Sequence, residues 1–209
     1  MKIHYPNGQP FQYNKNNSKK NRARAVPEYA NRGMTLEKEL NLTNQQYRDR
    51  NIAVIHKKPT PIQVVKVNYP KRSAAKITEA YYRKSSTTDY NGVYRGYYLD
   101  FEAKETKNKT TFPLANFHEH QINHIIQASE HGGICFTIVR FSSLDKIYLM
   151  DALFLKKWWA QQFKEKGRKS IPYTAIKKEC IEIPIGYNPR IPYLNAVDKL
   201  IENFKDDKI

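Results

Sequence analysis

A strict alternation of side-chain character in residues 97–104 constrains the fold of this chain more than any other feature of its sequence. The odd-numbered positions are aromatic or apolar: Tyr97, Leu99, Phe101 and Ala103. The even-numbered positions are polar or ionisable: Tyr98, Asp100, Glu102 and Lys104. Because successive side chains of a strand point to opposite faces of its sheet, we expect a strand over residues 94–105. One of its faces would pack on a core, and the other would present acids and an ammonium.

The surroundings of this strand decide whether its charged face is only solvated, as in many antiparallel sheets. Asp89 stands thirteen residues before Glu102, and Arg95 and Gly96 between them can form a turn. Such a turn would fold Asp89 back beside Glu102. Two carboxylates at one end of a sheet suit Mg²⁺, which binds through one or two carboxylates, waters and a substrate phosphate. Lys104 would lie within reach of the same phosphate or of its attacking water.

The remaining apolar patterns predict strands interrupted by helices. Strands are expected at residues 52–55, 62–67, 75–82, 134–141 and 146–150, with a hairpin turn at 142–145. Helices are expected from Thr35, from about residue 116 to 130, and over residues 153–166 and 193–204. A second capping signal at Thr43 predicts that the first helix can break there and restart. This order indicates an α/β fold with a mixed central sheet flanked by helices.

The charge of the chain indicates its partner. Its net charge is +16, from 36 Lys and Arg against 20 Asp and Glu. Such a surplus favours a polyanion, above all nucleic acid, with general solubility as the alternative. Residues 1–30 are polar and predict a flexible basic arm, followed by a single domain over residues 31–209. Residues 57–84 carry eight Lys and Arg and one Glu, and they predict a basic projecting β stalk between core strands.

Several other classes of protein are disfavoured. The two cysteines, Cys135 and Cys180, neither form a disulfide framework nor supply a zinc site, which fits a reducing cytoplasm. No signal core and no apolar run of about eighteen residues are present, so a soluble cytoplasmic protein is expected. His120 and His124 have metal-ligand spacing but lack a third ligand, so surface histidines are expected. No phosphate-binding glycine loop of the ATP-using kind occurs.

The spacing of Asp89, Glu102 and Lys104 resembles the active-site motif of the PD-(D/E)xK nuclease superfamily, although Thr88 replaces the usual proline. Longer segments resemble the RecU family of Holliday junction resolvases from Gram-positive bacteria. These segments are residues 31–34 (NRGM), 52–61 (IAVIHKKPTP), 68–72 (NYPKR), 86–92 (STTDYNG), 100–107 (DFEAKETK) and 189–194 (PRIPYL). The resemblance spans nearly the whole chain after the arm, and the family pairs Thr-Asp with Glu-Ala-Lys in the same way.

The resemblance implies a restriction-endonuclease-like core that cuts Holliday junctions in recombination and DNA repair. It implies a Mg²⁺ site, with Mn²⁺ as a substitute, formed by Thr87, Asp89, Glu102 and Gln121. Lys104 would stabilise the transition state. Since Gln121 lies one turn from Phe117 and from Ile125, it is expected at the inward edge of its helix or on a solvated flank. Paired cuts by one site per chain imply a homodimer, and the family also implies an interaction with the RecA recombinase.

Further residues are weaker candidates. The cations expected to touch DNA are Arg32, Lys57, Lys58, Lys71 and Arg72. Glu37 is either an accessory acid of the metal site or a first-turn acid favoured by its helix dipole. Asp100 is either a support for the site or an acid on its rim. Two other functions are open: a related nuclease acting on linear or damaged duplex, and a non-catalytic basic DNA-binding protein.

Overall fold

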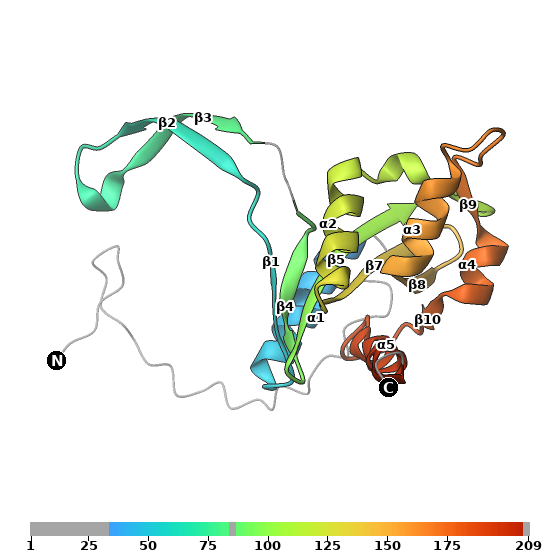
Figure 1. Cartoon of the computed structure of the whole chain (residues 1–209). Helices are drawn as coiled ribbons and strands as arrows, with labels where there is room; N and C mark the ends of the chain where they lie inside the picture. Colours follow the sequence, from blue (N-terminus) through green and yellow to red (C-terminus); the bar gives the residue numbers. More distant parts are fainter. Residues whose placement is uncertain (1–33, 84–86, 207–209) are drawn as a thin grey trace. The chain divides into compact units, whose positions relative to one another are not determined.

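A six-stranded mixed sheet forms the centre of the part of the chain that the structure describes, residues 34–83 and 87–206 of a computed structural model. Figure 1 shows this sheet between its helices. Its strand order is β1 (Val54–Lys57), β4 (Tyr90–Tyr94), β5 (Tyr97–Thr106), β7 (Ile134–Phe141), β8 (Lys146–Asp151) and β10 (Ile181–Ile183). Only β5 and β7 are parallel, and every other neighbouring pair is antiparallel. The predicted α/β fold with a mixed sheet is confirmed.

Helices cover both faces of the sheet, and each face has its own apolar core. On one face, α1 (Leu36–Asp49) and α5 (Leu194–Asp206) pack against the odd-numbered residues Leu99 and Phe101 of β5. On the other, α2 (Glu119–Glu130), α3 (Ala152–Gln161) and α4 (Tyr173–Glu179) pack against Cys135 and Val139 of β7. Burial on both faces explains why β7 is mostly apolar, since all eight of its residues are buried and only Thr137 and Arg140 among them are polar.

The even-numbered face of β5 is therefore not solvated. In the parallel register, Asp100 lies beside Cys135 and Glu102 beside Thr137, so these residues share the face that α2 covers. Asp100 and Glu102 are both 0% exposed. The solvated-face alternative for this strand is wrong, because a helix from later in the chain lies over the acids.

The turn that returns Asp89 toward Glu102 is present. Arg95 and Gly96 have positive φ angles of 50° and 81°, and they join β4 to β5 in an antiparallel hairpin. Residue 94 therefore belongs to β4, and the strand that carries the acids begins at Tyr97 rather than at residue 94.

Several predicted boundaries differ from the observed ones. The helix expected to break at Thr43 is continuous, because Thr43 and Asn44 are buried and the hydroxyl of Tyr193 donates to Asn44 Oδ1 at 2.5 Å. A 3₁₀ turn, Leu114–Asn116, precedes α2, so this helix begins at Glu119. The helix expected to reach residue 166 ends at Gln161. The patterns indicated a helix-to-strand transition near Cys180, where α4 ends and β10 begins, but they gave no bounds for these elements. They did not predict the small sheet of β6 (Thr111–Pro113) and β9 (Ser170–Pro172).

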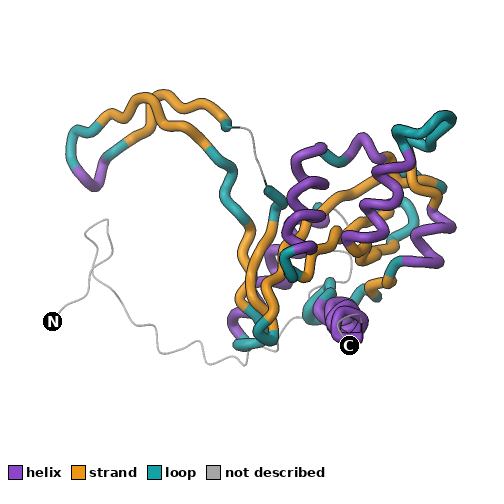
Figure 2. The backbone as a smooth tube through the Cα atoms, in the orientation of Figure 1, coloured by secondary structure: helices purple, strands orange, loops and turns teal. Residues whose placement is uncertain are grey.

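The segment predicted as a stalk forms its own two-stranded antiparallel sheet. It consists of β2 (Ile62–Asn68), the 3₁₀ turn Arg72–Ala74 and β3 (Lys76–Tyr82), and we refer to residues 62–82 as the ribbon. Figure 2 shows that the ribbon is inserted in the chain between β1 and β4, which pair with each other in the main sheet. Every residue of β2 and β3 is exposed.

Two predictions concern residues that the structure does not describe. The arm predicted at residues 1–30, and Arg32 after it, lie outside the described residues. Within the described ranges, none of the helices has the length and apolar character needed to cross a membrane.

Candidate active site

Asp89 and Glu102 meet where β4 begins, at the end of the β4–β5 hairpin that lies away from its turn. Asp89 directly precedes β4, and its backbone N–H donates to Glu102 Oε2 at 3.1 Å. Glu102 is completely buried, whereas Asp89 is only partly buried. The two acids are thus in contact through this hydrogen bond, with Asp89 on the side that solvent reaches.

The environment of Glu102 resists ionisation. Burial is the largest cause, and the contact with Asp89 adds to it, so that the pKa of Glu102 rises from 4.5 to about 8. Lys104 opposes this shift, since its Nζ lies 2.9 Å from Glu102 Oε1. Both side chains lie on the same face of β5, two residues apart, as the alternation predicted.

Asp100 occupies the same face, with four donors around it. Its Oδ2 accepts from Tyr98 Oη at 2.6 Å, Lys58 Nζ at 2.9 Å and His124 Nε2 at 3.1 Å, while Oδ1 accepts from the Thr88 hydroxyl. Burial alone would raise the pKa of Asp100, but these hydrogen bonds outweigh it and lower the pKa below its usual value. Asp100 is therefore an ionised interior acid, and the alternative of an acid on the rim is wrong.

A cavity of about 980 Å³ opens beside these acids. It is lined by residues 57–61, 87–89 and 118–121 and by Asn123, so Thr87, Asp89 and Gln121 all face it. Gln121 is 6% exposed, which contradicts a solvated flank, and its Oε1 accepts from the His118 backbone N–H at 3.1 Å. The structure thus brings Thr87, Asp89 and Gln121 to one cavity, with Glu102 in contact with Asp89.

The donor set suits a hard divalent cation. It consists of two carboxylates, a hydroxyl and an amide oxygen, and Mg²⁺ prefers such oxygen ligands. Glu102 Oε1 is buried, and the ammonium of Lys104 lies 2.9 Å from it. A bound cation would favour the ionised form of Glu102, which burial disfavours. In residues 34–83 and 87–206, no group of three His, Cys, Asp or Glu side chains has the arrangement of a metal site, so any site here depends on the Thr and Gln oxygens as well.

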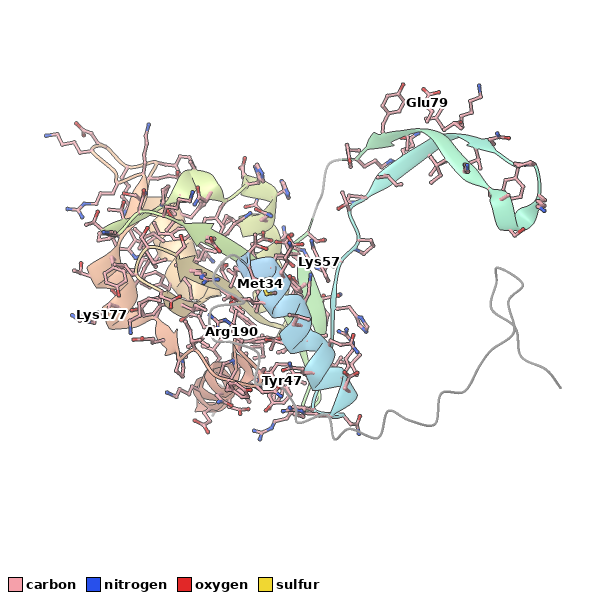
Figure 3. All side chains as sticks on the ribbon, turned by 180° about the vertical axis from the view of Figure 1, so that it is seen from behind. Met34, Tyr47, Lys57, Glu79, Lys177 and Arg190 are labelled. Carbon is pink, nitrogen blue, oxygen red and sulfur yellow. The ribbon has the colours of Figure 1, made fainter. Side chains whose placement is uncertain are left out.

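The weaker candidates have different surroundings. Lys57 is exposed and pairs with Glu37 of α1 at 2.5 Å, and Figure 3 shows it where the chain leaves β1 toward the ribbon. Lys58 turns inward to Asp100 and also lines the cavity. Lys71 is exposed before the 3₁₀ turn of the ribbon, and the side chain of Arg72 lies outside what the structure describes. Glu37 does not line the cavity.

Sequence reasoning missed three of the residues around Asp100. Thr88 was assigned to a motif position, Lys58 to contact with DNA, and His124 to the surface. His124 is instead partly buried, with 25% of its side chain exposed, and it contacts Asp100. The one signal in the sequence was the placement of His124 three residues after Gln121, which puts both near one helix face.

The family model described as RecU, recombination protein U, matches residues 31–199 of this chain. A Holliday junction resolvase RecU of Geobacillus kaustophilus (strain HTA426) is 60% identical over 200 residues, which cover 96% of this chain and 98% of that protein. That of Limosilactobacillus reuteri (strain DSM 20016) is 60% identical over 203 residues, with the same coverage. Among solved structures, the Holliday junction resolvase Hjc of Archaeoglobus fulgidus covers 69% of this chain and 95% of its own, at 8% identity and a TM-score of 0.39.

Proposed function

This chain belongs to the RecU family of recombination proteins, and we propose that it is a Holliday junction resolvase that cuts DNA by Mg²⁺-dependent hydrolysis of phosphodiester bonds. It would act in homologous recombination and DNA repair, in the cytoplasm where the chromosome lies. The observation that carries the catalytic part is the contact between Asp89 and Glu102 with the ammonium of Lys104 beside them. A protein that only coats DNA has no use for two acids held in contact beside a cavity.

The residues of the chain divide the chemistry between them. Asp89 and Glu102 would hold Mg²⁺, with the oxygens of Thr87 and Gln121 completing the set. Bound there, Mg²⁺ supplies Lewis-acid polarisation of the scissile phosphate and activation of a water. Lys104 orients the attacking water or neutralises the charge that grows on the phosphoryl oxygens. The expected products carry a 5′-phosphate and a 3′-hydroxyl, which a ligase can join.

The basic regions would hold the DNA. The ribbon and its flanks, residues 57–84, carry a net charge of +7, and the strands of the ribbon are exposed along their whole length. These cations fit the phosphates at the open centre of a four-way junction. Symmetric cuts in two strands require two sites, and each chain offers one, so we propose a homodimer. The interaction with RecA implied by the family stays a prediction.

A cleavage assay tests this proposal. A mobile four-way junction and a linear duplex of matched length are incubated with the full chain, with Mg²⁺ or with EDTA. We expect paired cuts in the junction only, and only with Mg²⁺. Cutting of the duplex at a similar rate would instead indicate a general nuclease, and binding without cuts would indicate a non-catalytic protein.

Two variants test the site itself. Asp89→Ala and Glu102→Ala should lose junction cleavage by roughly 10³-fold or more, because each removes a carboxylate from the place where charge must be stabilised. Junction binding in EDTA should persist, since the cations that contact phosphate are unchanged. Undiminished cutting by either variant would remove our assignment of the site.

A further inference from the structure

Asp100 is a buried acid that has no role in the proposed hydrolysis of DNA. It is 0% exposed and lies two residues before Glu102 on the same face of β5. Four groups donate to it, and each of its two oxygens accepts at least one of these hydrogen bonds. All four partners are donors, so a carboxylate suits this place better than any neutral side chain.

The donors reach Asp100 from separate segments of the chain. Tyr98 belongs to β5 itself, whereas Lys58 follows β1, Thr88 precedes β4 and His124 lies on α2. Two of these segments carry the candidate cation ligands. Thr88 stands between Thr87 and Asp89, and His124 lies about one helical turn after Gln121.

Lys58, in the segment that follows β1, forms hydrogen bonds through both its ammonium and its backbone N–H. Its ammonium donates to Asp100 Oδ2 at 2.9 Å and to Thr88 Oγ1 at 3.0 Å. Its backbone N–H donates to the carbonyl oxygen of Asp89 at 2.7 Å. The chain that leaves β1 for the ribbon is thus fixed to the same loop, residues 87–89, that Asp100 holds through Thr88.

Fold stability by itself does not explain this cluster. Burying charged groups is expensive, and replacing a buried ion pair by apolar side chains of similar volume is often neutral or stabilising. The cluster instead includes Thr88 and His124, which neighbour the candidate ligands on the loop and on α2. Outer hydrogen bonds of this kind set the orientation of metal-binding groups.

We propose that Asp100 is a positioning residue, which holds the loop of residues 87–89 and the helix α2 at the spacing that a divalent cation needs. The hydrogen bond from Thr88 to Asp100 fixes the positions of the adjacent residues Thr87 and Asp89. The hydrogen bond from His124 to Asp100 fixes the position of Gln121 on the same helix. This role rests on the proposed function, since it presumes that these residues bind a cation.

The test measures binding of Mn²⁺ alone to the full chain, without DNA, by isothermal titration calorimetry. In Asp100→Asn, an amide NH₂ necessarily faces one of the donors, and we expect Mn²⁺ binding 10–100-fold weaker than in the wild type, the range found when outer partners of metal ligands are replaced. Thr88→Val keeps the shape of the side chain but removes its hydroxyl. It should show a loss of the same kind, and it carries the test if Asp100→Asn does not fold.

Glu39→Gln is the matched control. Glu39 is also a buried acid, 2% exposed, but its partners are Arg140 and Arg190, and it belongs to α1 on the opposite face of the sheet. This variant should unfold at a lower temperature yet bind Mn²⁺ like the wild type. The double variant Asp100→Asn/Thr88→Val should bind no more weakly than Asp100→Asn, because both changes break the same connection.

Wild-type affinity in Asp100→Asn or Thr88→Val, or an equal loss in Glu39→Gln, would overturn the positioning role. Junction cleavage is measured in parallel to separate this inference from the proposed function. A wild-type chain that binds Mn²⁺ but leaves junctions intact would contradict the proposed function alone. A wild type that cuts junctions, with variants that bind Mn²⁺ normally, would contradict the positioning role alone.

Discussion

Lys104 Nζ lies 2.9 Å from Glu102 Oε1, and both side chains project from the same face of one strand. The side chain of Lys104 is 19% exposed whereas that of Glu102 is fully buried, so Lys104 connects a buried acid to the solvent side of the site. This pairing gives Lys104 two separable effects. One acts on the reacting phosphate, and the other acts on the ionisation of Glu102.

Lys104→Gln should lower the cleavage rate roughly 10²–10³-fold, because a positive charge beside the reacting phosphate is lost. Since Lys104 also lowers the pKa of Glu102, the variant should reach its maximum rate at a higher pH than the wild type. A pH–rate profile on a four-way junction measures both effects. Lys107→Gln, at an exposed lysine just beyond β5, is the control and should keep the wild-type profile. An unshifted profile in Lys104→Gln would contradict the pairing.

The raised pKa of Glu102 predicts how stability depends on pH in EDTA. Between pH 4.5 and about 8 the folded protein keeps a proton that the unfolded chain releases, so the free energy of unfolding falls as the pH rises. Glu102→Gln removes this dependence. The melting temperature of the variant, relative to the wild type, should therefore rise from pH 5 to 8 and then stay constant. A difference that is the same at all pH values would show that burial does not perturb Glu102.

Gly92→Ala should destabilise the protein by about 1–3 kcal/mol, the usual cost of forcing extra atoms into a packed interior. A Cβ at this position would meet the carbonyl oxygen of Val54 and would lie 2.6 Å from the Cα of Ile55. Both neighbours are backbone atoms of β1, which cannot move without disrupting its pairing with β4. Thermal unfolding measures the loss, with Val93→Ala as a control because the Val93 side chain is 51% exposed. Equal melting temperatures for the two variants would contradict the close approach of these strands.

Tyr193→Phe should cost about 1–3 kcal/mol, because it leaves the buried Asn44 Oδ1 without its donor. Asn44 Nδ2 already lacks a partner among the described residues, so the amide has no obvious compensation. Urea unfolding monitored by circular dichroism gives the free energy. Tyr187→Phe removes the same hydroxyl from a side chain that is 91% exposed, and it should have no effect. A loss in Tyr187→Phe as large as that in Tyr193→Phe would contradict a specific contribution of the buried hydrogen bond.

The sequence by itself determined the strand that carries Glu102 and Lys104, the turn at Arg95 and Gly96, and the return of Asp89 toward Glu102. These features depend on local rules: the two-residue period of a strand and the positive φ angles that a tight turn requires. The family resemblance then implied Thr87 and Gln121 as further ligands, and both line the same cavity as Asp89.

Only the tertiary structure decided what surrounds these residues. The face of Asp100 and Glu102 is buried because α2 packs over it, and no pattern within β5 distinguishes burial beneath a helix from exposure to water. The partners Thr88, His124 and Lys58 reach Asp100 across 12, 24 and 42 residues of sequence. The capping signal at Thr43 failed for the same reason, since Asn44 is held by Tyr193, 149 residues away. Local propensities are worth a few tenths of a kcal/mol to about 1 kcal/mol per residue, so such distant contacts outweigh them once the chain has packed.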